Sequence, residues 1–222
     1  MADVLETVEV THGTDVDAAV IFLHGLGADG HDFEPIVPEL RLGAMGVRFV
    51  FPHAPVRPVT INGGMAMRAW YDILSLDRNG LQDEAGVRDS EAHVRALMQR
   101  EFDRGIRPER LVLAGFSQGG AIALHTFLRT EEKLAGVMAL STYLPLHDKA
   151  GNEATDSNRA TPVFMAHGAF DPVLPITLGQ ASNTWMQQMG YAVEWKDYPM
   201  PHSVCPEEIR DMGAWFRKVF AK

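Results

Sequence analysis

The sequence predicts an α/β fold in which a mostly parallel central sheet carries helices on both faces, and three observations support this. Short apolar runs rich in β-branched residues alternate with longer segments of helical periodicity, as in chains built from strand–helix–strand crossovers. The 222 residues suffice for one such unit without requiring a second. The contents of 46% hydrophobic and 22% charged residues are ordinary for a globular protein. We therefore expect a single domain over residues 1–222.

The first half of the chain is expected to form two buried strands and two helices. In chain order they are predicted at 19–23 (strand), 33–40 (short helix), 48–51 (strand) and 84–104 (helix). Pro52 is expected to stop the second strand, because proline lacks the N–H that a strand ladder needs. Gly105 follows the long helical pattern as a plausible C-cap.

The second half repeats the alternation more regularly. Strands are predicted at 111–114, 136–140, 161–166 and 191–198, and helices at 118–128, 175–189 and 206–220. Two stretches break the pattern. Residues 147–160 are polar and are interpreted as a solvated loop. Residues 56–76 are rich in methionine and aromatic residues without a clean period, which is typical of a lid-like or groove-lining insertion or of an excursion that covers the core.

Bulk properties exclude several classes of partner. The formal net charge of −9 argues against nucleic acid and anionic membrane surfaces. The single cysteine, Cys205, rules out an internal disulfide and a multi-cysteine metal site. No apolar run approaches the length of a membrane span, so stable membrane insertion is not expected. The first residues show neither a basic segment nor an apolar core region, so we expect a cytoplasmic protein.

The pentapeptide GFSQG at 115–119 is the most informative motif. It follows the apolar run at 111–114 and precedes a helical pattern, which is the strand–turn–helix context of a nucleophile elbow. A sharp turn of this kind holds the central serine, Ser117, in a strained conformation, and only small residues two before and two after it let strand and helix approach. Ser117 is therefore the predicted nucleophile.

A serine needs a base to take its proton, and four histidines follow Ser117. His125 falls inside the next helix and is expected to point away from the serine. His147 opens the polar loop, and His167 lies at the end of a strand. His202 is the strongest candidate, because it lies in a loop after a strand, where ligands meet an open α/β sheet.

The acid that orients the base is expected between the serine and the histidine in the chain. Asp171 directly follows a strand and precedes a helix, which favours it over Asp148, Asp156 and Asp197. The alternative role for Asp171 is an N-cap of the helix near Pro175, but the carboxylate precedes that helical pattern by several residues.

The loop after the first predicted strand is expected to help stabilise negative charge on a substrate oxygen. The backbone N–H of Leu26 and that of Gln118, at the start of the helix after the serine, are the predicted donors. His24 is interpreted as structural. The run GLGADG at 25–30 also matches a dinucleotide-binding pattern, but residues 41–55 contain no acidic residue to bind a ribose, so that interpretation is disfavoured.

Six segments together resemble the carboxylesterase and acyl-protein thioesterase family, also called the phospholipase/carboxylesterase family. They are HGLGADG, WYDI at 70–73, GFSQGGA, STYLP at 141–145, HGAFDP and PHS. The resemblance implies an α/β-hydrolase fold, a Ser117–His202–Asp171 triad and hydrolysis of carboxylic esters and thioesters without metal or cofactor. It also implies that residues 56–76 flank an acyl groove. Its candidate lining residues are Met65, Met67, Trp70, Leu74, Leu76, Tyr143 and Leu144.

Other interpretations remain open from the sequence. A non-catalytic acyl-binding protein could use the same fold, since fold alone does not establish chemistry. Another hydrolase class, such as a lysophospholipase, a dienelactone-type hydrolase or a peptidase, is also compatible with the motifs. The expected substrate is a small-molecule or acylated-protein ester or thioester. A homodimer is compatible with the sequence, which does not fix the oligomeric state.

Overall fold

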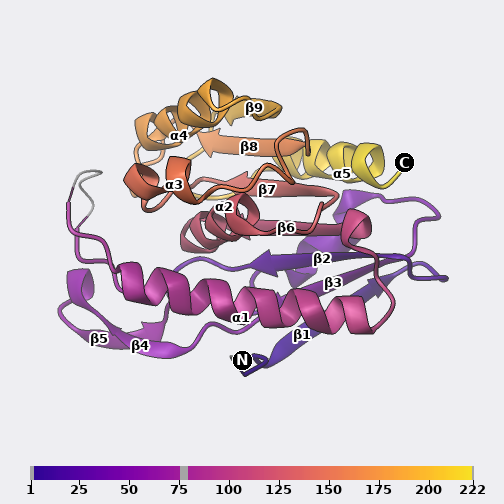
Figure 1. The fold of residues 1–222 in the computed structure, drawn as a ribbon, viewed down its shortest axis with the longest axis horizontal. Helices are drawn as coiled ribbons and strands as arrows, with labels where there is room; N and C mark the ends of the chain where they lie inside the picture. The colour runs from indigo at the N-terminus through magenta and orange to yellow at the C-terminus, as the bar shows by residue number, and fades with distance from the viewer. Residues whose placement is uncertain (1–2, 76–79, 222) are drawn as a thin grey trace.

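The computed structural model describes residues 3–75 and 80–221, and a twisted sheet runs through their centre (Figure 1). Within these residues the sheet has seven strands in the order β1-β3-β2-β6-β7-β8-β9. β1 pairs antiparallel with β3, and every other neighbouring pair is parallel. The strands of the sheet are β1 (Thr7–His12), β2 (Ala18–Leu23), β3 (Val47–Pro52), β6 (Leu111–Phe116), β7 (Gly136–Leu140), β8 (Val163–Gly168) and β9 (Val193–Tyr198).

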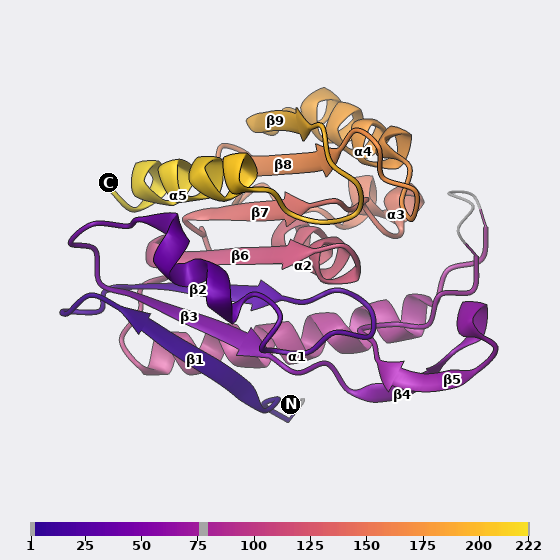
Figure 2. The ribbon, with the colours of Figure 1, turned by 180° about the vertical axis from the view of Figure 1, so that it is seen from behind.

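Helices cover both faces of the sheet, as predicted. The α-helices are α1 (Glu84–Asp103), α2 (Gln118–Arg129), α3 (His147–Glu153), α4 (Ile176–Gln188) and α5 (Pro206–Phe220). The short 3₁₀ helices are η1 (Glu34–Leu40), η2 (Thr60–Asn62) and η3 (Pro108–Arg110). Figure 1 shows α1 to α4 on one face, and Figure 2 shows α5 and η1 on the other. No helix in the described ranges is both long and apolar enough to cross a membrane.

Alternating residues of the central strands pack into two separate hydrophobic cores, one on each face of the sheet. In β2, Ile21 belongs to the core under α1 and α2, whereas its neighbours Val20 and Phe22 belong to the core under α5 and η1. Side chains of a strand point to opposite faces in turn, so a strand covered on both sides becomes apolar throughout. This is why β2, β6 and β8 are buried along their whole length while the edge strand β1 is partly exposed.

The strand order also decides where a ligand can bind. The chain passes from β2 outward to β3 and then returns to place β6 on the other side of β2. The loops after β2 and β6 therefore diverge at the carboxyl ends of two adjacent strands, which is the topological switch point of an open α/β sheet. The loops that follow β8 and β9 open at the same edge, because all four strands are parallel.

Residues 56–76 include a small hairpin, which the missing periodicity did not reveal. β4 (Val56–Val59) and β5 (Met65–Arg68) pair antiparallel, with η2 between them. The tip turns at Gly63 and Gly64, both with positive φ. The hairpin is joined to the loop after β2, because the N–H of Gly27 donates to the carbonyl of Arg68 at 2.9 Å.

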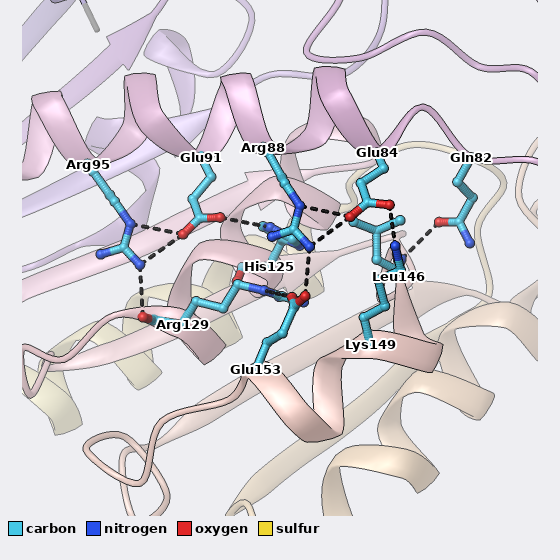
Figure 3. Close-up of polar contacts among 10 residues, drawn as sticks. All are labelled: Gln82, Glu84, Arg88, Glu91, Arg95, His125, Arg129, Leu146, Lys149 and Glu153. Atoms are coloured by element: carbon cyan, nitrogen blue, oxygen red, sulfur yellow. Dashed lines mark hydrogen bonds and ion pairs between the residues drawn. The ribbon is translucent and has the colours of Figure 1, made fainter. Parts of the chain in front are cut away.

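One other prediction of local structure is wrong, and one strand was missed. Residues 147–153 form α3 rather than a solvated loop, since Lys149 and Glu153 are anchored by ion pairs to α1 and α2 (Figure 3). β3 ends at Pro52, as predicted, with Pro52 as its last residue and paired with Thr7. β1 was missed because its alternating polar and apolar residues lie on a half-exposed edge.

Candidate active site

Ser117 occupies a sharp turn between β6 and α2. Its backbone has φ 54° and ψ −121°, which is uncommon for a residue other than glycine. A Cβ on Gly115 would overlap the backbone of Gly119, and a Cβ on Gly119 would overlap the carbonyl of Leu23. The N–H of Ser117 donates to the carbonyl of Leu140 at 2.8 Å, which fixes the turn against β7. The steric requirement for small residues on both sides of the serine is therefore met.

Three side chains that lie far apart in the sequence form one continuous hydrogen-bonded path. His202 Nε2 lies 2.9 Å from Ser117 Oγ, and His202 Nδ1 lies 2.6 Å from Asp171 Oδ2. The serine follows β6, the aspartate follows β8 and the histidine follows β9. Parallel strands bring their following loops to one edge of the sheet, so these three groups meet there.

The aspartate is fixed by its own loop. Asp171 Oδ1 accepts hydrogen bonds from the N–H of Val173 at 2.9 Å and from that of Leu174 at 2.8 Å, while Oδ2 faces the histidine. Its side chain is fully buried. The carboxylate thus closes the turn before α4 and contacts His202 at the same time. It does not cap α4, whose N-cap is Pro175 and which has no side-chain cap.

The hydrogen-bond partners of His202 determine which of its nitrogens carries the proton. An ionised carboxylate can only accept, so Nδ1 of His202 holds a hydrogen and donates it to Asp171. In the neutral ring Nε2 then presents a lone pair to Ser117 Oγ. The serine hydroxyl is therefore the donor of the 2.9 Å contact, which is the arrangement required for proton transfer from serine to imidazole.

The remaining candidate acids and bases are not part of this path, although His167 Nε2 lies 3.5 Å from Asp171 Oδ2. Asp148 belongs to α3, Asp156 forms an exposed ion pair with Arg159, and Asp197 lies on β9. Three histidines also remain outside the path. His125 is buried in α2, His147 begins α3, and His167 donates from Nε2 to the carbonyl of Leu174 at 2.8 Å.

The two predicted oxyanion donors lie beside the serine. Leu26 and Gln118 both line the cavity into which Ser117 opens. Gln118 is the first residue of α2, so its N–H is one of the four that a helix leaves without an intrahelical acceptor. Among the residues that the structure describes, the N–H of Leu26 has no acceptor either.

His24 holds the loop that carries Leu26. Its Nε2 accepts a hydrogen bond from the N–H of Ala54 at 3.1 Å, so Nδ1 carries the proton and donates to the carbonyl of Gly25 at 2.7 Å. Burial lowers the pKa of His24 to about 4. The neutral ring is therefore a structural bridge, in agreement with its interpretation from the sequence.

The side chain of Gln118 makes contacts that the sequence did not indicate. Its Oε1 accepts from the backbone N–H of Trp70 at 2.8 Å, and its Nε2 donates to the carbonyl of Tyr71 at 2.7 Å. The indole Nε1 of Trp70 in turn donates to the carbonyl of His24 at 2.9 Å. The start of α2, the 70–71 segment and the loop after β2 are thereby tied together around the serine.

A cavity of about 300 Å³ opens at Ser117 and His202. Its wall is mostly apolar, which suits a ligand with a hydrocarbon portion. Besides the motif residues already named, the wall is formed by Ala28, Asp32, Tyr71, Ile73, Phe116, Tyr143, Val173 and Leu174. All but Asp32, Val173 and Leu174 lie within the six segments that resemble the family, although only Tyr143 was predicted to line the groove. Val173 and Leu174 directly follow HGAFDP, so their place in the chain is the signal that could have revealed them.

The seven predicted groove residues are dispersed. Tyr143 lies on the cavity wall. Met65 and Leu74 are exposed, with 65% and 41% of their surface accessible, and Met67 is half-buried on β5. Trp70 and Leu144 are buried among core residues. Leu76 lies outside the described residues.

Comparison with known proteins agrees with this geometry. A model of the phospholipase/carboxylesterase family matches residues 6–220. The chain belongs to the phospholipase/carboxylesterase family. The predicted α/β-hydrolase fold and the predicted hydrolase of carboxylic esters and thioesters are confirmed at the level of this family.

Relatives within the phospholipase/carboxylesterase family extend over most of the chain. Acyl-protein thioesterase 1 of Cryptococcus neoformans is 42% identical over 215 residues, which cover 89% of this chain and 90% of that protein. Acyl-protein thioesterase 1 of Gibberella zeae is 43% identical over 213 residues, with 90% of each covered. Zea mays acyl-protein thioesterase 2 superposes with a TM-score of 0.86 at 28% identity, covering 97% of this chain and 99% of that chain. Arabidopsis thaliana SOBER1 gives 0.86 at 29% identity, with 91% and 98% covered.

Proposed function

We propose that Ser117, His202 and Asp171 form the catalytic triad of this enzyme and cleave esters and thioesters through an acyl-enzyme. The observation that carries the proposal is the unbroken path from Asp171 through His202 to Ser117, which opens on the 300 Å³ cavity. Nucleophile, base and orienting acid each stand within hydrogen-bond reach of the next, which is the geometry that such catalysis requires.

In the first half of the reaction Ser117 Oγ attacks the acyl carbonyl carbon while His202 Nε2 takes the serine proton. Asp171 stabilises the resulting imidazolium. The N–H groups of Leu26 and Gln118 bind the oxyanion of the tetrahedral intermediate, and each donor of this kind lowers the barrier by about 2.7–4 kcal/mol. The bond between the acyl carbon and the leaving oxygen or sulfur then breaks, and His202 protonates the leaving group.

In the second half a water molecule replaces the leaving group. His202 Nε2 removes a proton from the water as its oxygen attacks the acyl carbon, and the same two N–H groups bind the second oxyanion. The ester bond to Ser117 breaks, the serine recovers its proton from His202, and the carboxylic acid leaves. No residue outside the five already named has to donate or accept a proton or bind the oxyanion.

The cavity wall indicates the substrate class. Its apolar surface suits the acyl portion of an ester or thioester, and the names of the thioesterase relatives support an acylated protein as one substrate. The hairpin β4–β5, tied to the loop of Leu26 through Gly27 and Arg68, is proposed to flank the entrance. A lysophospholipid or a small ester fits the same chemistry, so chain-length profiles decide among them.

We also propose a cytoplasmic location and a homodimeric assembly. A cytoplasmic location is supported by the single cysteine, Cys205, which cannot form an internal disulfide. A homodimer is the proposed assembly, and sedimentation of the purified chain at several concentrations tests it. A mass that stays at that of one chain, 24.5 kDa, contradicts the dimer.

Turnover of matched oxygen ester and thioester substrates tests the proposed activity. Ser117→Ala is expected to lower kcat/KM by about 10⁴-fold or more and to abolish covalent labelling by a fluorophosphonate. Ser157→Ala, at an exposed serine after α3, is the matched control and is expected to keep both. Undiminished turnover by Ser117→Ala contradicts the assignment of Ser117 as the nucleophile. If the wild type binds acyl chains but does not turn them over, an acyl-binding protein is favoured instead.

A further inference from the structure

Two tyrosine hydroxyls meet at the wall of the active-site cavity. The hydroxyl oxygens of Tyr71 and Tyr143 lie 2.9 Å apart, and both residues line the cavity together with Ser117 and His202. Tyr71 follows β5 and Tyr143 follows β7, so the pair joins two distant segments. Most of the surrounding wall consists of apolar side chains such as Ile73, so the pair forms a polar spot on it.

The two hydroxyl groups have one hydrogen more than the single hydrogen bond between them uses. Each hydroxyl carries one hydrogen, and a single hydrogen bond between the two oxygens uses one of them. Burial raises the pKa of both Tyr71 and Tyr143, so both stay protonated at neutral pH. In the described part of the chain neither hydroxyl makes a second hydrogen bond. One O–H therefore lacks an acceptor among the described residues, and such a donor becomes costly when a ligand excludes water from it.

The unpaired hydrogen belongs to Tyr143. Tyr71 is the more buried residue, with 4% of its surface accessible, and its backbone is fixed by the bond from Gln118 Nε2 to its carbonyl. Tyr143 is only partly buried. Tyr71 thus donates to Tyr143, and the hydrogen of Tyr143 is directed to the cavity. A hydroxyl that already accepts a hydrogen bond is a stronger donor, because chains of hydrogen bonds polarise one another.

The carboxyl group on the cavity wall does not satisfy this hydrogen. Asp32 also lines the cavity, but no hydrogen bond joins it to Tyr71 or Tyr143. The apolar side chains of Ile73 and Leu174 offer no acceptor. The acceptor must therefore come from whatever fills the cavity.

We propose that Tyr143 donates a hydrogen bond to a second oxygen of the substrate, separate from the scissile carbonyl. The preferred substrates are then esters or thioesters that carry an ether, hydroxyl or carbonyl oxygen a few bonds from the scissile carbonyl, rather than plain alkyl esters. This inference rests on the proposed function, because it assigns a specificity-determining group to the same site. A plain hydrocarbon chain leaves the donor of Tyr143 unsatisfied.

Pairs of substrates that differ by one atom test this specificity. In one series an ether oxygen replaces a methylene at the third, fourth or fifth position of a hexanoyl ester, and in a second series a methoxyethyl ester replaces a butyl ester. The ratio of kcat/KM within each pair is measured for the wild type, Tyr143→Phe and Tyr71→Phe. Comparing the ratios between enzymes cancels the intrinsic reactivity of the esters.

Tyr143→Phe is expected to lower the preference for the oxygen-bearing member of at least one pair by about 3- to 10-fold, as one neutral hydrogen bond allows. Tyr71→Phe is expected to retain the preference, since Tyr143 keeps its hydrogen. Tyr191→Phe is the matched control, because its buried hydroxyl has no hydrogen-bond partner among the residues described and its ring packs against Phe127 in the core. Its ratios are expected to equal those of the wild type, and thermal melting checks that all three variants fold.

Two results overturn the inference while leaving the proposed function intact. One is a ratio within twofold of the wild type for Tyr143→Phe in every pair. The other is a loss of preference in Tyr71→Phe that Tyr143→Phe does not share. If the wild type hydrolyses neither member of any pair, or if Ser117→Ala keeps its turnover, the proposed function fails and the inference fails with it.

Discussion

Two histidine–carboxylate pairs stand at different places in this molecule. At the carboxyl edge of the sheet His202 Nδ1 lies 2.6 Å from Asp171. Between α1 and α2 His125 Nε2 lies 2.9 Å from Glu91 (Figure 3). The chemical groups are nearly the same, so the difference between the two pairs shows what a candidate catalytic histidine needs beyond an acid partner.

The two pairs differ at the ring nitrogen that does not contact the carboxylate. That of His202 faces Ser117 Oγ and the cavity. That of His125 is buried and, among the described residues, has no hydrogen-bond partner. Burial lowers the pKa of His125, and the bond to Glu91 opposes this change. An imidazole can act as a base only where a substrate group can reach it, so the inner pair is structural.

Ion pairs surround the inner pair and join three helices. Arg88 of α1 donates to Glu153 of α3 at 2.7 Å, and Arg129 of α2 donates to the same carboxylate at 2.7 Å. Arg95 of α1 donates to the carbonyl of Arg129 at 2.8 Å. Figure 3 shows these side chains converging between the helices. The network holds α3 in place and lies away from the cavity wall.

The largest expected effect is the loss of the outer carboxylate. Asp171→Asn is expected to lower kcat by about 10³- to 10⁴-fold, because the amide favours the wrong tautomer of His202 and cannot stabilise its cation. Steady-state kinetics with one ester substrate measure the change, and circular dichroism confirms the fold. A loss below tenfold would place the acid elsewhere and remove the distinction between the two pairs.

The same change at the inner pair is the matched control. Glu91→Gln is expected to keep kcat/KM within about threefold, whereas the free energy of unfolding falls by about 1–3 kcal/mol as a buried hydrogen bond to His125 weakens. Urea denaturation measures the second quantity. Activity loss equal to that of Asp171→Asn in a stably folded variant contradicts a structural role for Glu91.

A third histidine, His24, is also structural, and its role can be tested through the pH dependence of stability. The folded-state pKa of His24 is depressed to about 4, whereas an unfolded histidine titrates near 6.5. Between these values the unfolded chain binds a proton that the folded chain does not. The free energy of unfolding therefore falls as pH drops through this window, by up to about 3 kcal/mol from this residue.

Denaturation curves at several pH values measure the contribution of His24. The variant His24→Gln, which cannot titrate, is expected to have a shallower slope between pH 6.5 and 4. Burial also lowers the pKa of His125 and His167, so part of the slope remains. Identical slopes for the variant and the wild type would show that His24 is not held neutral.

The smallest expected effect concerns the side chain that links the outer pair to the cavity wall. Gln118→Met keeps the backbone N–H and the volume but loses the bonds to Trp70 and Tyr71. We expect kcat to fall by about tenfold with a smaller change in KM, because a misplaced donor weakens binding of the transition state. An unchanged kcat would mean that the backbone alone positions the donor.

The sequence predicted that Ser117, Asp171 and His202 would meet, because chemistry and topology constrain their positions together. Ser117, Asp171 and His202 each follow a strand, and parallel strands bring such loops to one edge. Local pattern sufficed there, since the G-x-S-x-G turn admits few alternatives. The element boundaries of β7 and α5 were also predicted to the residue, because glycine, proline and an apolar run mark them.

The groove could not be predicted in the same way. In an irregular segment no period indicates which side a residue faces, so Trp70 was expected in the groove although its indole points inward to the carbonyl of His24. α3 depends on ion pairs to Arg88 and Arg129, which lie distant in the chain. Contacts of this kind follow from the assembled fold and not from local propensity.

The hairpin β4–β5 is bonded at one end to the loop that carries Leu26, and its other end is exposed. The carbonyl of Arg68 accepts a hydrogen bond from the N–H of Gly27, and the N–H of Trp70, two residues further on, donates to Gln118. The tip, with Ile61, Gly63 and Gly64, is exposed. With the hairpin at the entrance, as proposed, substitutions at its exposed tip are expected to change which substrates enter more than how they react. The tip is therefore a position where substrate preference can be varied, by evolution or by protein engineering, with little loss of activity.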